Sequence, residues 1–166
     1  MEELKVRNVM IGKQFEESEN LEKFLEIVKS KKILISVVEA GSRINIEKNL
    51  YFDVLWPSTL QSISENSINN NALVCKLNYN NFSILFTGDV EEEAERVLTS
   101  KYIDRNTLKS TVLKVAHHGS KSSSTEDLLK LIQPKVALIG VGKNNTFGHP
   151  NSDVLNRFDK LRFKNL

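Results

Sequence analysis

The chain has 166 residues, of which 40% are hydrophobic and 27% are charged, and its formal net charge is +2. This length suffices for one buried core, so we expect a single domain over residues 1–166. So small a net charge does not by itself indicate nucleic-acid binding, which depends on clustered Lys and Arg side chains. No apolar run approaches the roughly 20 residues that span a bilayer, so we expect the chain itself to be soluble. The single cysteine, Cys75, excludes an intrachain disulfide, and we interpret it as a small buried hydrophobe.

The first third of the chain alternates strand and helix patterns. Residues 4–12 are predicted to form a strand, and Ser18 is expected to cap a helix whose apolar residues recur at helical spacing as far as Val28. The continuous apolar run 33–38 predicts a strand that is buried on both faces. An alternating apolar pattern over residues 51–56 predicts a half-buried strand, which ends before Pro57.

The middle of the chain begins with a polar segment, residues 58–71, that is rich in Ser and Asn. We interpret it as a mobile loop, and we expect the side chains of Asn69–Asn71 to bond to backbone groups rather than to act in catalysis. Two apolar runs, residues 73–79 and 82–86, flank Asn80-Asn81. Since Asn tolerates the positive φ of a tight hairpin, these two strands are predicted to pair antiparallel.

The last part of the chain continues the alternation of helices and strands. The glutamates at positions 91–93 fall in the first turn of a helix, where carboxylates offset the helix dipole, and we prefer this interpretation to metal binding. Thr125 is expected to cap a helix over residues 126–132, a strand is predicted over residues 136–141, and Ser152 is expected to cap the last helix.

Polar side chains follow the strands of this second half. The strand 82–86 runs into Thr87-Gly88-Asp89, and the apolar run 112–116 runs into His117-His118-Gly119-Ser120. Because parallel strands joined by a helix end at the same edge of a sheet, Asp89 and these histidines are expected to lie close together. A carboxylate with imidazoles suits Zn²⁺ or Mn²⁺. The third histidine, His149, also follows a predicted strand.

Several roles are open for these residues. Asp89 is either a metal ligand or a helix N-cap. Neighbouring side chains of an extended segment point to opposite faces, so we expect only one of His117 and His118 to bind a metal, and the sequence does not decide which. His149 is a metal ligand, a substrate contact or a loop brace.

Five further polar residues are candidates for contacts with a substrate phosphate. A Lys side chain would act through its charge, and Ser or Asn side chains through hydrogen bonds. For each of them, the alternative is an exposed position without a role in binding. The candidates are Lys114, Ser120, Lys143, Asn144 and Asn145.

Four motifs occur in a fixed order: NNNALVCKL from Asn69, TGD from Thr87, LKVAHHGS from Leu113 and VGKNNTFGHP from Val141. Together they resemble the carboxyl-terminal half of the metallo-β-lactamase-like domain of ComEC-type DNA-uptake (competence) proteins. The resemblance implies an α/β fold, namely half of an αββα sandwich with a mixed β-sheet and flanking helices. The superfamily signature His-x-His-x-Asp-His is absent from this sequence, so we expect a partial domain that lacks that segment.

The resemblance also implies a function. In the intact domain, Asp89 would bridge two metal ions that activate a water molecule for attack on a DNA phosphodiester, and the domain would be attached to a polytopic membrane protein. With Asp89, one of His117 and His118, and His149 as its own ligands, this chain is expected to bind metal weakly and to hydrolyse little. The alternative is a non-catalytic half-domain that forms a homodimer or docks on DNA or on the missing amino-terminal half. A weaker option is a hydrolase of a small ester or lactone.

Overall fold

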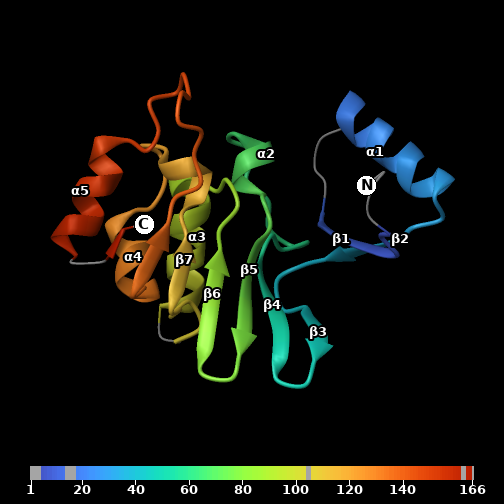
Figure 1. The fold of residues 1–166 in the computed structure, drawn as a ribbon, viewed down its shortest axis with the longest axis horizontal. Coiled ribbons are helices and arrows are strands. Elements are labelled where there is room, and N and C mark those ends of the chain that lie inside the picture. Colours follow the sequence, from blue (N-terminus) through green and yellow to red (C-terminus); the bar gives the residue numbers. More distant parts are fainter. Residues whose placement is uncertain (1–4, 14–17, 104–105, 162–163, 166) are drawn as a thin grey trace.

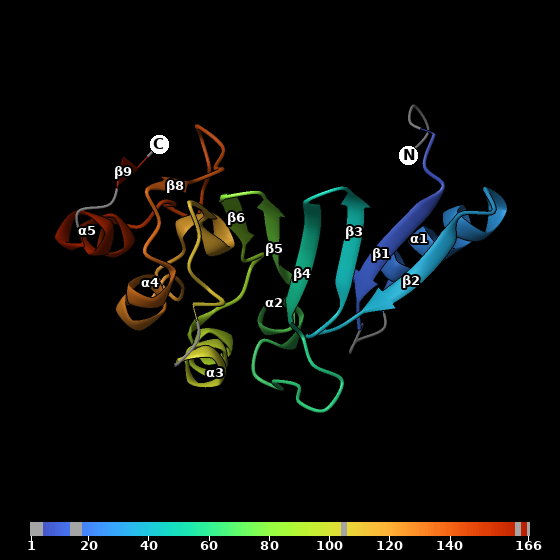
Figure 2. The same ribbon diagram turned by 90° about the horizontal axis from the view of Figure 1, so that it is seen from below.

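The computed structural model describes residues 5–13, 18–103, 106–161 and 164–165. These residues form two sheets that lie side by side, with α1 over the smaller sheet and the remaining helices around the larger one (Figures 1 and 2). The first residue of the strand expected over residues 4–12 lies outside the described residues. Of the described residues in that range, 8–12 form the strand β1 (Asn8–Gly12), and residues 5–7 precede it without regular structure.

The smaller sheet is a parallel pair of strands at the amino-terminal end of the molecule. It consists of β1 and β2 (Leu34–Val38), which are connected by α1 (Glu19–Ser30). The predicted cap of α1 is confirmed, because the Ser18 side chain accepts a hydrogen bond from the backbone N–H of Leu21 at 3.2 Å.

The larger sheet has the strand order β3-β4-β5-β6-β7-β8-β9 in the described residues. Neighbouring strands from β3 to β6 run antiparallel, and those from β6 to β9 run parallel. The sheet is therefore mixed, and the predicted antiparallel hairpin is its β5–β6 pair. The strands are β3 (Arg43–Glu47), β4 (Leu50–Trp56), β5 (Val74–Tyr79), β6 (Phe82–Phe86), β7 (Val112–Lys114), β8 (Val136–Leu138) and β9 (Lys164–Asn165).

Helices cover one face of the larger sheet (Figure 2). They are α3 (Glu92–Tyr102), α4 (Glu126–Ile132) and α5 (Ser152–Lys160), and they share one hydrophobic cluster with the strands. Trp56, Leu85 and Phe158 are each fully buried in this cluster. The mixed sheet with flanking helices confirms the expected fold class. Across the described residues, no helix combines the length and the apolarity needed to cross a bilayer.

The opposite face of the larger sheet carries a row of apolar side chains. The strand register aligns these residues from β3 to β8, and each of them is only half-buried. The row consists of Ile44, Phe52, Leu77, Ile84, Val112 and Val136.

Two predictions about burial are wrong. The run 33–38 is not buried on both faces, because Leu34 and Val37 are 68% and 62% exposed. Its strand, β2, has β1 as its ladder partner within the small sheet, so only part of its surface is covered. The alternation expected over residues 51–56 also breaks down. A register shift between Val54 and Trp56 leaves both of them and the residue between them buried.

The segment 58–71 is more ordered than a loop, because it contains the short helix α2 (Ser67–Asn70). The side chain of Asn71 accepts a hydrogen bond from Ile63 N and donates to the Ile63 and Ser67 carbonyl oxygens. The Asn70 side chain donates to Glu65 O at 2.8 Å. The prediction of side-chain bonds to backbone groups is confirmed for these two asparagines.

One of the two predicted caps is confirmed in position and the other is wrong. Thr125 is the N-cap residue of α4, but its side chain makes no cap bond, and the Glu95 carboxylate accepts hydrogen bonds from the backbone N–H groups of Ser124 and Thr125. The N-cap of α5 is Asn151, whose side chain accepts from Asp153 N, so Ser152 is already the first helical residue.

Candidate functional site

The ends of β6 and β7 meet, as the sequence predicts. Thr87 donates its hydroxyl hydrogen to Lys114 O at 2.7 Å, and the backbone N–H of His117 donates to Gly88 O at 3.1 Å. These two bonds tie the Thr87-Gly88-Asp89 turn to the short 3₁₀ turn η1 (Ala116–Gly119). The turn that carries Asp89 therefore lies directly beside His117.

Asp89 is not the N-cap of α3. The N-cap is Glu91, and the Asn70 side-chain oxygen accepts hydrogen bonds from the backbone N–H groups of Glu91 and Ala94 at 3.1 and 3.4 Å. The Asp89 carboxylate is partly exposed and makes no hydrogen bond or ion pair with any described residue. Asp89 therefore does not act as a helix cap, and its role in metal binding stays a prediction.

The two neighbouring histidines lie in different surroundings. The premise of an extended segment is wrong, because His117 and His118 have positive φ angles of 46° and 55° in η1. The exposed His118 places Nδ1 at 2.5 Å from Gly140 O. His117 is one-quarter exposed and lies with its ring centroid 5.8 Å from that of His149, in an edge-to-face arrangement. His117, rather than His118, thus shares its surroundings with the third histidine.

The loop that carries His149 is fixed by Asn145. The Asn145 side chain accepts a hydrogen bond from His149 N at 2.9 Å and donates to His149 O at 2.7 Å. Both functional groups of this amide are therefore used inside the loop, where they favour bracing over contact with a phosphate. Of the other predicted phosphate contacts, Ser120 is buried with its hydroxyl 3.0 Å from that of Ser122, and Lys143 is exposed.

Phe147 is a feature of this loop that the sequence analysis did not single out. Its ring stacks on that of His149, with centroids 6.0 Å apart and planes 20° apart, and the residue is 80% exposed. The sequence does contain a signal for this residue, because Phe147-Gly148-His149 places an aromatic residue two positions before a motif histidine.

The donor atoms at this edge are of the kind that binds Zn²⁺ or Mn²⁺. The Nδ1 atoms of His117 and His149 are both buried without a hydrogen-bond partner. Within the described residues, however, no three His, Cys, Asp or Glu side chains converge closely enough to hold a metal ion. The described residues thus fit a contribution to a metal site but do not form a complete one.

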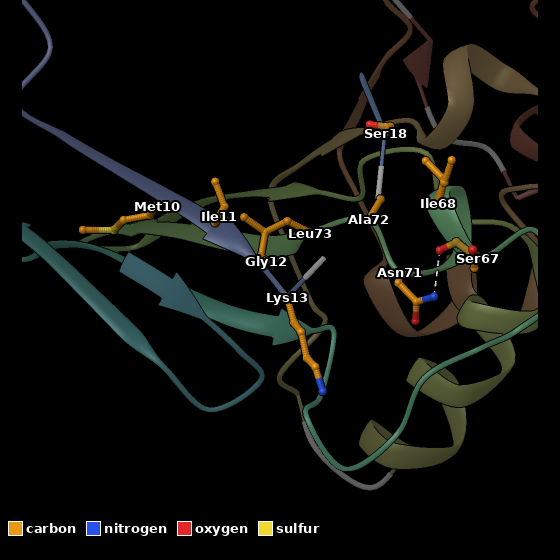
Figure 3. Close-up of a pocket in the computed structure, with 10 residues that line it drawn as sticks. All are labelled: Met10, Ile11, Gly12, Lys13, Ser18, Ser67, Ile68, Asn71, Ala72 and Leu73. Atoms are coloured by element: carbon orange, nitrogen blue, oxygen red, sulfur yellow. Dashed lines mark hydrogen bonds between the residues drawn. The ribbon is translucent and has the colours of Figure 1, made fainter. Parts of the chain in front are cut away.

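A pocket of about 330 Å³ lies elsewhere, between β1 and the region of α2 (Figure 3). Met10 and Ile11 line it from β1, and Ile68 and Leu73 from the segment around α2. Among the described residues that line it there is no His, Cys, Asp or Glu.

Comparison with known proteins defines the class. Residues 70–143, which include Asp89, His117 and His118, match the family described as Metallo-beta-lactamase superfamily. The chain is 36% identical over 151 residues to "ComE operon protein 3" of Bacillus subtilis (strain 168), an alignment that covers 91% of this chain. It is 32% identical over 115 residues to "Recombination protein 2" of Haemophilus influenzae, and 33% identical over 106 residues to "Competence protein ComA" of Neisseria gonorrhoeae, covering 69% and 64% of this chain.

The motifs and these matches agree. Residues 70–143 match the metallo-β-lactamase superfamily, and most of the chain is similar to a segment of competence proteins of the ComEC type. The chain spans only 19%, 14% and 15% of the lengths of these three relatives.

Proposed function

We propose that this chain is part of a metal-dependent hydrolase domain that cleaves DNA phosphodiesters in a competence-type DNA-uptake protein. In this proposal, Asp89, His117 and His149 supply part of a ligand set that groups outside these residues complete. The observation that carries it is the meeting of the β6 and β7 ends, where His117 bonds to the turn of Asp89 and contacts His149. Attachment to a polytopic membrane protein, which the family resemblance implies, is part of the same proposal.

The site residues would have distinct roles. A bound Zn²⁺ or Mn²⁺ would supply a hydroxide nucleophile and stabilise the developing oxyanion. On this chain, the carboxylate of Asp89 and a ring nitrogen of His117 would hold the ion. His118 would not, because its Nδ1 lies against the carbonyl oxygen of Gly140. The braced loop would bring His149 to the same edge.

Two exposed side chains support DNA as the substrate. Lys143 is exposed and makes no ion pair with a described residue, so its charge is available for a phosphate. Phe147 presents an aromatic face, on which bases of a single strand stack. The names of the relatives, which refer to competence and recombination, agree with this substrate.

A second candidate is the non-catalytic half-domain. The lack of three converging metal donors among the described residues favours it, and so does the uncovered apolar row on the larger sheet. In this function the row would pack against a second copy of the chain or against another part of the domain, and the polar edge would contact DNA without cleaving it.

The test is the metal content of the purified chain after dialysis against Zn²⁺ and against Mn²⁺. The variants are the double substitution Asp89→Ala with His117→Ala, and His118→Ala as a control that also removes an imidazole. Stoichiometric metal that the double substitution abolishes and the control retains would support the hydrolase, and cleavage of single-stranded DNA would then be measured. A chain that takes up neither metal would favour the non-catalytic half-domain.

A further inference from the structure

Glu91 is a largely buried carboxylate that lies between the α2 segment and His117. One of its oxygens, Oε2, accepts a hydrogen bond from Asn66 Nδ2 at 2.8 Å. The other, Oε1, lies 3.2 Å from Nδ1 of His117, and the two side chains are 17% and 25% exposed. The sequence analysis assigned Glu91 only to the helix dipole, yet its side chain faces a histidine of the candidate site.

The core of the protein fixes the position of Glu91. Its backbone N–H donates to the side chain of Asn70, which is 1% exposed. The Asn70 carbonyl in turn accepts from the indole N–H of Trp56 at 2.6 Å, and Trp56 is fully buried. A chain of hydrogen bonds therefore runs from the core through α2 to the backbone of Glu91, and the bond from Asn66 holds the carboxylate itself.

The two ring nitrogens of His117 differ in their surroundings. Nδ1 is buried, and although it is within ion-pair distance of Glu91, the alignment of the two groups is not that of a hydrogen bond. Nε2 makes no hydrogen bond with a described residue and is not among the buried atoms without a partner, so it is accessible. An ionised carboxylate accepts hydrogen bonds only, so a neutral imidazole facing it is satisfied when Nδ1 carries the hydrogen.

We propose that Glu91 is a positioning residue that holds His117 as the Nδ1–H tautomer and so presents the Nε2 lone pair at the edge shared with Asp89 and His149. A partner that fixes the tautomer and the ring orientation in this way is a general requirement of imidazoles that bind a metal or accept a proton. The proposal rests on the proposed function only in taking His117 as a residue of the site. The tautomer itself is a property of the metal-free chain.

The test is the tautomer of His117, measured by two-bond ¹H–¹⁵N NMR on the ¹⁵N-labelled, metal-free chain at about pH 8.5, where imidazoles are neutral. The chain has only three histidines, so variants at each of them assign the signals. In the wild type, we expect Nδ1 of His117 to carry the hydrogen. Glu91→Ala should move the hydrogen partly or wholly to Nε2, whereas Glu91→Gln should preserve the wild-type pattern because an amide oxygen facing Nδ1 also favours the hydrogen on that atom.

Glu92→Ala is the matched control, because this neighbouring carboxylate is exposed and should leave the His117 signals unchanged. A wild-type His117 that carries its hydrogen on Nε2 would overturn the proposal, and so would a tautomer that Glu91→Ala does not alter. If Glu91→Ala fails to fold, the wild type and Glu91→Gln still decide. A chain that shows the expected tautomer but neither binds metal nor cleaves DNA would favour the non-catalytic half-domain over the hydrolase and leave the role of Glu91 intact.

Discussion

The side chain of Glu95 joins three helices, and its replacement tests how the helical layer is held together. This residue of α3 is fully buried, and its two oxygens accept the backbone N–H groups of Ser124 at 2.5 Å and of Thr125 at 2.7 Å, at the start of α4. Arg157 of α5 donates to the carbonyl oxygens of Ser123 and Ser124 in the same turn. The perturbation we choose is Glu95→Gln, which keeps the shape of the side chain.

The magnitude follows from the number of acceptors. A glutamine has one oxygen in place of two, and its amide NH₂ would face the second backbone N–H, donor against donor. A buried N–H left without a partner costs about 1–3 kcal/mol. The remaining hydrogen bond also loses its charge assistance, which makes such bonds roughly twice as strong as neutral ones. We therefore expect a loss of about 2–3 kcal/mol in the free energy of unfolding, or about 5–10 °C in Tm for a chain of this size.

The pKa of Glu95 adds a dependence on pH. Burial raises this pKa, and the N–H groups of Thr125 and Ser124 and the charge of Arg157 only partly offset the effect. The folded protein therefore binds the proton more tightly than the unfolded chain does. The stability that this carboxyl contributes is fully present below its unfolded pKa of about 4.3 and is lost as pH rises towards the folded pKa. Glu95→Gln has no carboxyl at this position, so this pH change should be present in the wild type and absent from the variant.

The assay is urea unfolding at about pH 5 and about pH 8, followed by the fluorescence of Trp56, the single tryptophan, which is fully buried. The control is Glu92→Gln on the same helix, which removes an equal charge from an exposed position. Unfolding free energies of Glu95→Gln and wild type that agree within about 0.5 kcal/mol at both pH values would refute the reasoning.

Three further predictions concern single sites. Burial raises the pKa of the Cys75 thiol to about 11. Iodoacetamide at pH 8 should therefore alkylate the native chain roughly 100-fold more slowly than the urea-unfolded chain. Equal alkylation rates would contradict the burial of the thiol. Gly119→Ala should cost about 2–3 kcal/mol in urea unfolding, because Gly119 has φ +79° and a Cβ there would lie 2.8 Å from Pro150 Cβ. Gly142→Ala, with no atom within 4 Å of the added Cβ, should be neutral by comparison. Phe147→Ala should weaken binding of a fluorescent single-stranded oligonucleotide about 5- to 100-fold with an unchanged Tm, and undiminished binding would exclude base stacking.

The sequence predicted the order of elements well because their signals are local. The apolar runs on either side of Asn80-Asn81 and the stop at Pro57 depend only on neighbouring residues, and the structure has β5, β6 and β4 at those places. The meeting of Asp89 and His117 was also predictable, because the rule for parallel strands needs only their order.

The predictions that failed, wholly or in part, depend on residues far apart in the chain. Thr125 is the N-cap residue of α4, but its side chain makes no cap bond, and Glu95, 30 positions earlier, accepts from its backbone N–H. The exposure of Leu34 depends on which strands lie beside β2. The contact of Glu91 with His117 joins positions that no sequence pattern links, so its role beyond the helix dipole could not be inferred from spacing.

The apolar row on the uncovered face of the larger sheet supports the last prediction. Leu77 and Ile84 are paired in register at its centre and are half-buried, whereas Leu85 points to the opposite face and is fully buried under the helices. An apolar face of this kind is more stable when another surface covers it. We therefore expect the chain to self-associate in sedimentation velocity at high concentration.

Leu77→Ser combined with Ile84→Ser should shift the chain towards the monomer. The cost in stability should be small for each substitution, because both side chains already contact solvent. Leu85→Ser is the contrasting control and should lose about 3 kcal/mol or more through cavity formation and burial of a hydroxyl. A wild-type chain that stays monomeric at about 100 μM would mean that the face is stable in water. That result would remove the main structural support for a docking role and leave the polar edge at Asp89 and His117 as the feature that function must explain.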